Sequence, residues 1–252
     1  MKITVLIENS APEGLVPEHG LSFHLEYRGG RYLLDAGESG VFVLNARDLG
    51  ADLGAVEAAF LSHGHYDHGD GLSAFFRLNR TAPVYARPAV REDDVLHGNH
   101  VGLDPGLFRR HARRFDLADG PREPFPGLHL IPDAVAHEQS LALETEAGLV
   151  VLNSCCHAGV DNILEDIRAR FPGTPLRAVL GGFHLMGPGG TSTLGPSPEA
   201  VRALARRLRD ELDVAQVCTG HCTGAPGYQL LAEELGARLH PLTTGAVFEF
   251  PD

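Results

Sequence analysis

The sequence predicts a layered α/β protein, and two observations lead to that prediction. Short apolar stretches typical of strands alternate along the chain with segments whose apolar residues recur at helical spacing. Four of the apolar strands run into loops that hold a histidine, at His63, His157, His184 and His221. Ligands and catalysis in layered α/β folds collect where strand ends meet loops. We therefore expect the functional site in these loops.

The first third of the chain contains clear strand, turn and helix signals. The segment "RGG" separates two apolar runs and predicts a hairpin. Helices are expected where the apolar spacing changes to three and four residues, and Ser39 is the expected N-cap of the first one. The expected elements are strands at 3–8, 22–27 and 31–34, a helix over about 40–50, a strand at 58–61, a helix over 69–79 and a strand at 84–86.

Periodicity disappears over residues 87–130 and returns in the second half. A loop-rich segment of this length inside a compact domain is usually functional, so we expect a lid or an insertion there. In the second half, strands are expected at 141–143, 149–152, 176–180, 214–218, 238–240 and 246–250, and helices at 161–171, 198–212 and 228–235.

Composition excludes several classes of function. The net charge of −12 argues against a general nucleic-acid or anionic-membrane surface, although a bound dication would still permit an anionic substrate. We find no apolar run of 18 or more residues and no secretory signal. All four cysteines lie beyond residue 150, two of them adjacent. We therefore expect a reduced, cytoplasmic protein that uses a small molecule, and the sequence leaves its oligomeric state open.

The stretch "LSHGHYDHGDGL" carries the strongest chemical signal. His63, His65 and Asp67 alternate, so they point the same way if the strand stays extended, while His68 faces elsewhere unless the chain turns. Such a loop can offer two ligand pairs in different directions, which suits two metal ions better than one. Imidazole and carboxylate donors suit zinc, iron(II) or manganese. The alternative is a solvated polar loop, which this density of ligand-type side chains disfavours.

The same stretch resembles the H-x-H-x-D-H motif of the metallo-β-lactamase superfamily. The segments "EHGLSFHLEYRGGRYLLDAGESGVFVLNARDLG", "NSCCHAGVDNIL", "GGFHL" and "GHCTG" resemble one branch, the dihydropterin ribofuranosylaminobenzene phosphate synthase-like proteins. The resemblance implies an αββα sandwich with metal ions at one edge of its two sheets. It also implies a single domain over residues 1–252, with the lid or insertion at about 87–130.

The resemblance also implies a set of metal ligands. His63 and His65 would bind the first ion, whereas Asp67 and His68 would bind the second. His221 matches the last histidine of the superfamily pattern and would complete the ligands of the second ion. The middle ligands depart from that pattern.

Three alternatives stay open at the middle position. Cys155 stands about where a bridging aspartate would be, and it is either a ligand or a small buried side chain. His157 follows it, and we expect His157 to be a ligand of one of the two ions. His137 is the positional match to the usual middle histidine. Cys222, next to His221, is expected to pack around the metal.

The function that these features predict is metal-dependent hydrolysis. Two zinc ions, or iron or manganese in their place, would make hydroxide available for attack on a phosphoester or carboxyl-type ester. Asp67 would also orient the water, and His184 would handle protons or substrate oxygens. The arginines of 109–114 would either contact phosphate or form a solvated face.

Two other functions remain open. The branch resemblance implies a synthase that uses a phosphoribosyl diphosphate-type donor and loses pyrophosphate and carbon dioxide. The third possibility is a metal-dependent protein that binds its ligand without catalysis.

Overall fold

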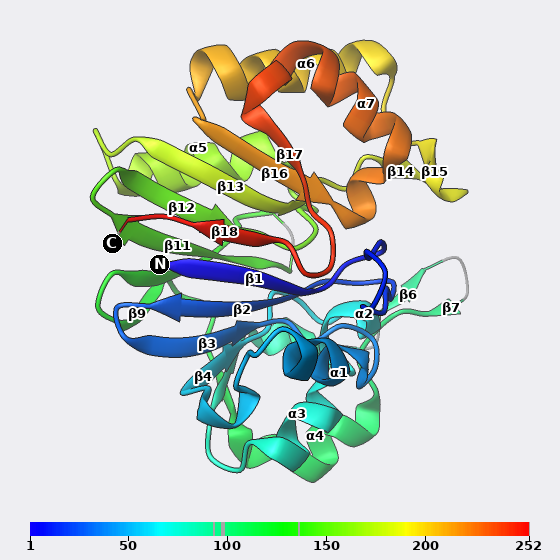
Figure 1. Ribbon diagram of the computed structural model, residues 1–252, viewed down its shortest axis with the longest axis vertical. Coiled ribbons are helices and arrows are strands. Elements are labelled where there is room, and N and C mark those ends of the chain that lie inside the picture. The colour runs from blue at the N-terminus through cyan, green and yellow to red at the C-terminus, as the bar shows by residue number, and fades with distance from the viewer. Residues whose placement is uncertain (93, 97–98, 136, 252) are drawn as a thin grey trace. The chain divides into compact units, whose positions relative to one another are not determined.

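The computed structural model describes residues 1–92, 94–96, 99–135 and 137–251. The chain divides into two compact units. Unit 1 comprises Met1–Gly120 and Thr243–Asp252, and unit 2 comprises Pro121–Leu242. Each unit contains one large sheet and its own helices (Figure 1). Whether residues 1–252 form a single domain stays a prediction.

The sheet of unit 1 has seven strands in the order β18-β1-β2-β3-β4-β5-β8. Pairing is antiparallel from β18 to β3 and parallel from β3 to β8. The strands are β1 (Lys2–Ile7), β2 (Ser22–Tyr27), β3 (Gly30–Leu34), β4 (Ala58–Phe60), β5 (Val84–Ala86), β8 (Phe115–Leu117) and β18 (Val247–Glu249). The parallel strands all end at one edge of the sheet, so the loops that follow β3, β4 and β5 share that edge.

Helices cover one face of this sheet with apolar side chains. Leu33, Ala59 and Val84 of the sheet share a core with Phe42 of α1 and Phe75 of α3. Burial of this apolar surface is the main force that holds the helices to the strands. The helices are α1 (Val41–Asp48), α2 (Tyr66–Gly69), α3 (Leu72–Leu78) and α4 (Pro105–His111).

Two expectations about the helices of unit 1 were wrong in detail. The N-cap of α1 is Gly40 and not Ser39. The hydroxyl of Ser39 is hydrogen-bonded to Glu18, and it accepts only a 3.2 Å bond from the amide of Val41. The helix expected over 69–79 is split, because α2 turns at Tyr66 and α3 begins only at Leu72.

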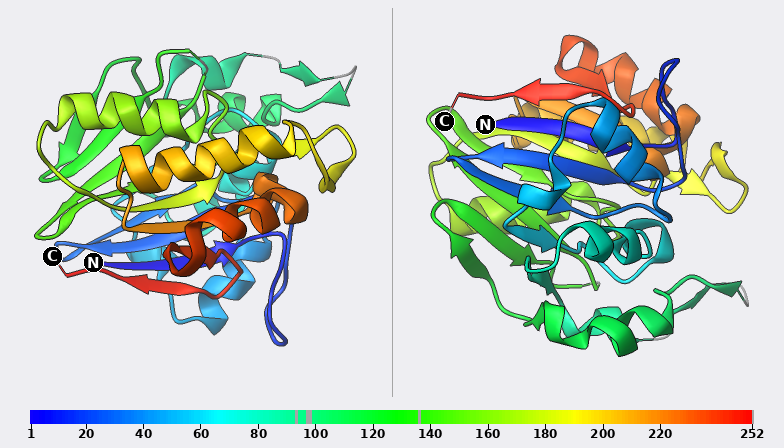
Figure 2. Two further views of the ribbon diagram at one scale, coloured as in Figure 1. Left: turned by 90° about the horizontal axis from the view of Figure 1, so that it is seen from above. Right: turned by 60° about the horizontal axis from the view of Figure 1, so that its bottom comes forward.

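The segment expected to be loop-rich is more regular than its sequence indicates. It contains α4 and β8 of unit 1, then β9 and β10 of unit 2. A short ribbon of β6 (Val95–Leu96) and β7 (Asn99–His100) projects from unit 1 (Figure 2). Short strands and single helical turns give too little periodicity to read from sequence. A lid role for this segment stays a prediction.

The sheet of unit 2 also has seven strands, in the order β17-β16-β13-β12-β11-β10-β9. Pairing is antiparallel from β9 to β12 and parallel from β12 to β17. The strands are β9 (Arg122–Phe125), β10 (Leu128–Pro132), β11 (Gln139–Thr145), β12 (Gly148–Leu152), β13 (Leu176–Gly182), β16 (Gln216–Gly220) and β17 (Leu239–Pro241). The carboxyl ends of β12, β13 and β16 therefore meet at one edge.

Helices α5 (Val160–Arg170), α6 (Pro198–Arg206) and α7 (Gly224–Leu235) cover a face of this sheet (Figure 1). Val151 and Val179 of the sheet share a core with Leu164 of α5, Val201 of α6 and Leu231 of α7. A small ribbon of β14 (Met186–Gly187) and β15 (Gly190–Leu194) projects from unit 2 and contacts α7 (Figure 2). The sequence did not predict this ribbon.

The predicted fold class is confirmed: the protein is a mixed α/β structure with two large sheets flanked by helices. All the strands predicted from sequence are present, with ends that differ from the prediction by at most two residues. In the described part of the chain, no helix combines the length and apolarity needed to cross a membrane.

Candidate metal centre

The histidine motif of unit 1 lies at the carboxyl end of β4. Hydrogen bonds tie the end of the strand to its neighbours, since the amide of Leu61 donates to Tyr85 and the carbonyl of Phe60 accepts from Asp35. The chain bends at His63 and Gly64, His65 is extended with φ −85° and ψ 147°, and α2 begins at Tyr66. This turn brings His63, His65, Asp67 and His68 into one cluster.

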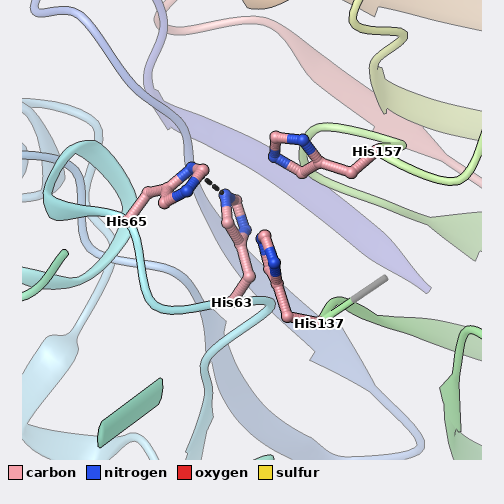
Figure 3. Close-up of side chains that lie close together, drawn as sticks. All are labelled: His63, His65, His137 and His157. Carbon is pink, nitrogen blue, oxygen red and sulfur yellow. Dashed lines mark hydrogen bonds between the residues drawn. The ribbon is translucent and has the colours of Figure 1, made fainter. Parts of the chain in front are cut away.

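Two pairs of donor atoms face each other within this cluster. Nε2 of His63 lies 3.0 Å from Nδ1 of His65, and the dashed line in Figure 3 marks this contact. Nε2 of His68 lies 3.4 Å from Oδ2 of Asp67. The sequence-based assignment, in which His63 and His65 serve one ion while Asp67 and His68 serve another, stays a prediction.

Hydrogen bonds on the far side of each ring fix which nitrogen carries a proton. The hydroxyl of Ser62 donates to Asp35 over 2.7 Å, so its oxygen accepts from Nδ1 of His63 at 2.9 Å. Nδ1 of His68 donates to the carboxylate of Asp35 over 2.9 Å, and Nε2 of His65 donates to Asp94 over 2.8 Å. These partners assign the lone pairs to Nε2 of His63, Nδ1 of His65 and Nε2 of His68.

This assignment has a chemical consequence for the pair His63 and His65. Two lone pairs that face each other at 3.0 Å repel, unless a proton or a metal cation lies between or beside them. Metal-binding histidines in proteins generally donate their other ring N–H to a carboxylate, a carbonyl or water, which holds the ring in place. The cluster has this arrangement and therefore fits a metal ion.

Three residues of this cluster were not predicted from sequence. Asp35 follows β3, is fully buried and has a φ of 56°, a conformation that costs free energy outside glycine. Nε2 of His19 lies 3.4 Å from Oδ2 of Asp67. The carboxylate of Asp94 accepts a hydrogen bond from His65. The signal that could have revealed Asp35 is its place directly after a strand parallel to β4.

In unit 2 the predicted residues gather at the carboxyl ends of β12, β13 and β16. The ring centroids of His157 and His184 are 4.4 Å apart, and those of His157 and His137 are 5.0 Å apart (Figure 3 shows His137 and His157). His221 follows β16, and a Cβ added at Gly182 would lie only 3.2 Å from its ring. The glycine at the end of β13 therefore leaves room first for Sγ of Cys222 and the carbonyl oxygen of Ser154, which that Cβ would meet at 2.5 and 2.8 Å, and then for the His221 ring.

Glu138, which was not singled out in the sequence, positions the loop after β12. Its carboxylate accepts from the backbone amide of Cys155 at 2.7 Å and from that of His157 at 2.9 Å. The side chain is fully buried, and hydrogen bonds to a carboxylate are stronger than those to neutral groups. Glu138 therefore fixes the backbone that presents His157.

The cysteines of unit 2 fall into two kinds. Burial raises the pKa of the Cys218 thiol to about 12 and that of Cys156 well above its usual value, so both stay protonated. Cys222 differs, because its sulfur lies 3.5 Å from the sulfur of Cys155 and accepts from the amide of His184 at 3.2 Å. Burial opposes its ionisation, but hydrogen bonds with Cys155 and His184 outweigh burial and lower the pKa of Cys222 to about 6.

The same contact acts on His184. Its hydrogen bond with Cys222 raises the pKa of the imidazole, although burial opposes that shift. His184 has a φ of 50°, and the neighbouring loops contain two more residues in this strained region, Cys156 at 57° and His221 at 49°. Backbone strain of this kind concentrates at functional sites. The loops of unit 2 are therefore held in an unusual conformation around the predicted residues.

The arginine run at 109–114, which spans the end of α4 and the turn after it, is partly used inside unit 1. Arg114 donates to the carbonyls of Asn79 and Ala82 and lies over the ring of Phe76. Arg110 pairs with Asp104 at 2.9 Å. These two arginines have structural partners within unit 1, and a phosphate-binding role for the run stays a prediction.

Comparison with known proteins adds the decisive observation. The family described as "Beta-lactamase superfamily domain" matches residues 30–206, which is more than half of the chain. The chain belongs to the beta-lactamase superfamily. One protein of known structure that is similar to this chain is Tm1679, whose crystal structure is described as that of a metal-dependent hydrolase of the beta-lactamase superfamily. It is 28% identical, covers 100% of both chains and has a TM-score of 0.83.

Two further relatives of this beta-lactamase superfamily protein differ in what they are described to do. The 7,8-dihydropterin-6-methyl-4-(beta-D-ribofuranosyl)-aminobenzene-5'-phosphate synthase of Methanocaldococcus jannaschii is 26% identical over 92% of this chain and 90% of its own length. A diphosphatase of the PhnP family is 16% identical and has a TM-score of 0.61, over 99% of this chain and 97% of the other. The second likeness shows the fold alone. The relatives of this superfamily member therefore include enzymes of more than one reaction type.

Proposed function

We propose that this protein is a metal-dependent hydrolase of a phosphoester or carboxyl-type ester. The observation that supports it most strongly is the pair of ring nitrogens on His63 and His65, which direct two lone pairs at each other over 3.0 Å. The 28% identity to a metal-dependent hydrolase over the full chain supports the same reaction class. The donor set suits zinc, and it also suits iron(II) or manganese.

The ligand set taken from the sequence is part of this proposal. His63 and His65 hold one ion, Asp67 and His68 the other, and His157 and His221 add the ligands predicted from unit 2. A bound metal ion supplies a Lewis acid and lowers the pKa of water, to about 7 in good zinc sites. The substrate is a small anionic molecule, and the protein works in the cytoplasm without nucleic acid or membrane.

Side chains of this protein supply the proton chemistry. The carboxylate of Asp67 accepts a hydrogen bond from the attacking water and so orients it. His184 is the proposed proton donor to the leaving oxygen, because Cys222 raises the pKa of its imidazole and keeps it protonated at higher pH. The two roles are complementary, one acceptor and one donor.

The second candidate is the synthase reaction. The supporting observation is 26% identity over 92% of this chain to a protein named as such a synthase. This reaction would release pyrophosphate and carbon dioxide, whereas hydrolysis would release neither. The two functions are therefore separable by their products.

The test is elemental analysis of the purified protein, followed by activity screening against phosphodiesters, phosphomonoesters, thioesters and lactones. We expect bound metal and turnover of at least one class, with both lost in His63→Ala and His68→Ala. His240→Ala, which removes a histidine of β17, is the matched control and should retain both. Full metal content in the His63→Ala/His68→Ala double variant would overturn the proposal.

A separate assay addresses the synthase. Pyrophosphate release from a phosphoribosyl diphosphate-type donor, without turnover of any ester, would replace the hydrolase by the synthase. Bound metal without either activity would favour the third function, a metal-dependent binding protein.

A further inference from the structure

His19 lies outside the predicted motif, yet its side chain is close to Asp67 of that motif. Its Nε2 is 3.4 Å from Oδ2 of Asp67, and the same oxygen is 3.4 Å from Nε2 of His68. Two imidazole nitrogens from two segments of unit 1 therefore share one carboxylate oxygen as their common neighbour. The His19 side chain is 39% exposed and that of Asp67 only 9%.

These two distances fit shared coordination better than hydrogen bonding. A charged N–H···O hydrogen bond measures about 2.7–2.9 Å, well below 3.4 Å. Ligands that each lie about 2.0–2.1 Å from one tetrahedral zinc ion are separated by about 3.4 Å from each other. Nε2 of His19 therefore lies from Oδ2 of Asp67 at the spacing of two neighbouring ligands of one ion, and so does Nε2 of His68.

The backbone holds His19 at this place. Gly20 has a φ of 129°, and a Cβ added to it would lie 2.0 Å from the carbonyl oxygen of Asp67. Any other residue at position 20 would push the two segments apart, because that contact is with backbone. On the other side, the carboxylate of Glu18 accepts from the amides of Glu38 and Ser39 at 3.1 and 3.0 Å.

From this geometry we infer that His19 is a further ligand of the metal ion at Asp67. The inference rests on the proposed function, since it needs a metal ion at Asp67. It adds a ligand from a loop that precedes β2, far in sequence from the histidine motif. The competing role for His19 is an ion pair with Asp67 in which no metal takes part.

The two roles predict opposite effects on metal binding. If His19 is a ligand, His19→Ala removes a donor and weakens binding. If His19 is only an ion-pair partner, its imidazolium competes with the metal for Asp67, so His19→Ala strengthens binding or leaves it unchanged. The sign of the change in affinity therefore separates them.

The experiment is a zinc titration of chelator-treated protein against a competing indicator, repeated with cobalt(II) to record absorption. For His19→Ala we expect at least about a tenfold loss of affinity at one of two sites, together with an altered cobalt spectrum. His68→Ala should lose the same site, and His240→Ala should match the parent protein. Equal melting temperatures of the metal-free variants will show that the fold is intact.

The outcomes distinguish the two proposals. Unchanged or increased affinity in His19→Ala, with the site lost in His68→Ala, overturns the role of His19 and leaves the proposed function standing. A parent protein that binds neither zinc nor cobalt(II) overturns both.

Discussion

Asp35 shows how one buried carboxylate organises several site residues. Its two oxygens accept from the amide and hydroxyl of Ser62 and from Nδ1 of His68, at 2.7–2.9 Å. Through Ser62 it also sets the proton position on His63. All three donors need an acceptor, and the two oxygens of the Asp35 carboxyl group accept from all of them.

Asp35→Asn is expected to weaken metal binding without abolishing the fold. The amide keeps one acceptor oxygen and adds an N–H group, so at least one of the three donors loses its acceptor. We expect metal affinity to fall about 10–100-fold and the free energy of unfolding to fall by about 1–3 kcal/mol. Zinc titration and chemical denaturation measure the two effects. Asp48→Asn, which changes an exposed carboxylate, is the control. If the Asp35→Asn and Asp48→Asn proteins bind zinc with equal affinity, the role given to Asp35 is wrong.

At the scale of an element, strand β2 contains a buried histidine that the site does not use. His24 is 2% exposed and is paired across the sheet with Leu33 and Thr4. Its Nε2 has no hydrogen-bond partner among the described residues. Burial is the main cause that lowers the pKa of its imidazole. The nearby charged groups act in both directions and are Glu26, Lys2, Arg31 and Asp52.

This shift makes β2 sensitive to acid. Because the pKa of His24 is lower in the folded protein, the unfolded chain binds more protons below its ordinary value of 6.5. The free energy of unfolding therefore falls as pH drops below about 6.5 and continues to fall until the folded pKa is reached. His24→Leu removes this contribution.

We expect metal-free His24→Leu to be more stable than the parent protein, with a difference that grows from pH 7 to pH 5. Removing the unpaired polar atom accounts for about 1–3 kcal/mol at neutral pH. Urea denaturation at several pH values measures it, with His240→Leu as the control. A difference that stays constant with pH would show that His24 does not titrate in this way.

For the molecule as a whole, metal should act as a stabilising ligand. A ligand that binds only the folded state adds RT ln(1 + [L]/Kd), about 2.7 kcal/mol at one hundred times Kd. Zinc should raise the melting temperature of the chelator-treated protein, and chelator should reverse the change. The His63→Ala/His68→Ala double variant should show no response, and a full response in that variant would argue for zinc binding elsewhere.

Hydrogen exchange across the whole molecule tests the prediction that His157 and His221 also bind metal. Zinc should slow hydrogen exchange in peptides that contain 61–69, 153–158 and 219–223, because ligation suppresses local opening. Protection confined to the first peptide would restrict the metal to unit 1.

The sequence by itself determined the strand–loop–histidine pattern and the family. Strands such as 22–27 and 176–180 are visible because their signals are local: apolar runs bounded by turn residues. The motif residues lie within six positions of each other, so their proximity needs no knowledge of the fold. The short elements between 87 and 130 escaped prediction because a two- or three-residue strand has no measurable period.

Only the tertiary structure decided how these side chains are supported. Asp35 reaches Ser62 and His68 because β3 and β4 pair in parallel, and Glu138 reaches Cys155 because β11 pairs with β12. Sequence spacing does not encode such contacts, since they depend on which strands become neighbours and in what register. The proton positions on His63 and His68 follow from the contacts of Asp35, and with them the direction in which each of these two rings can bind a metal ion.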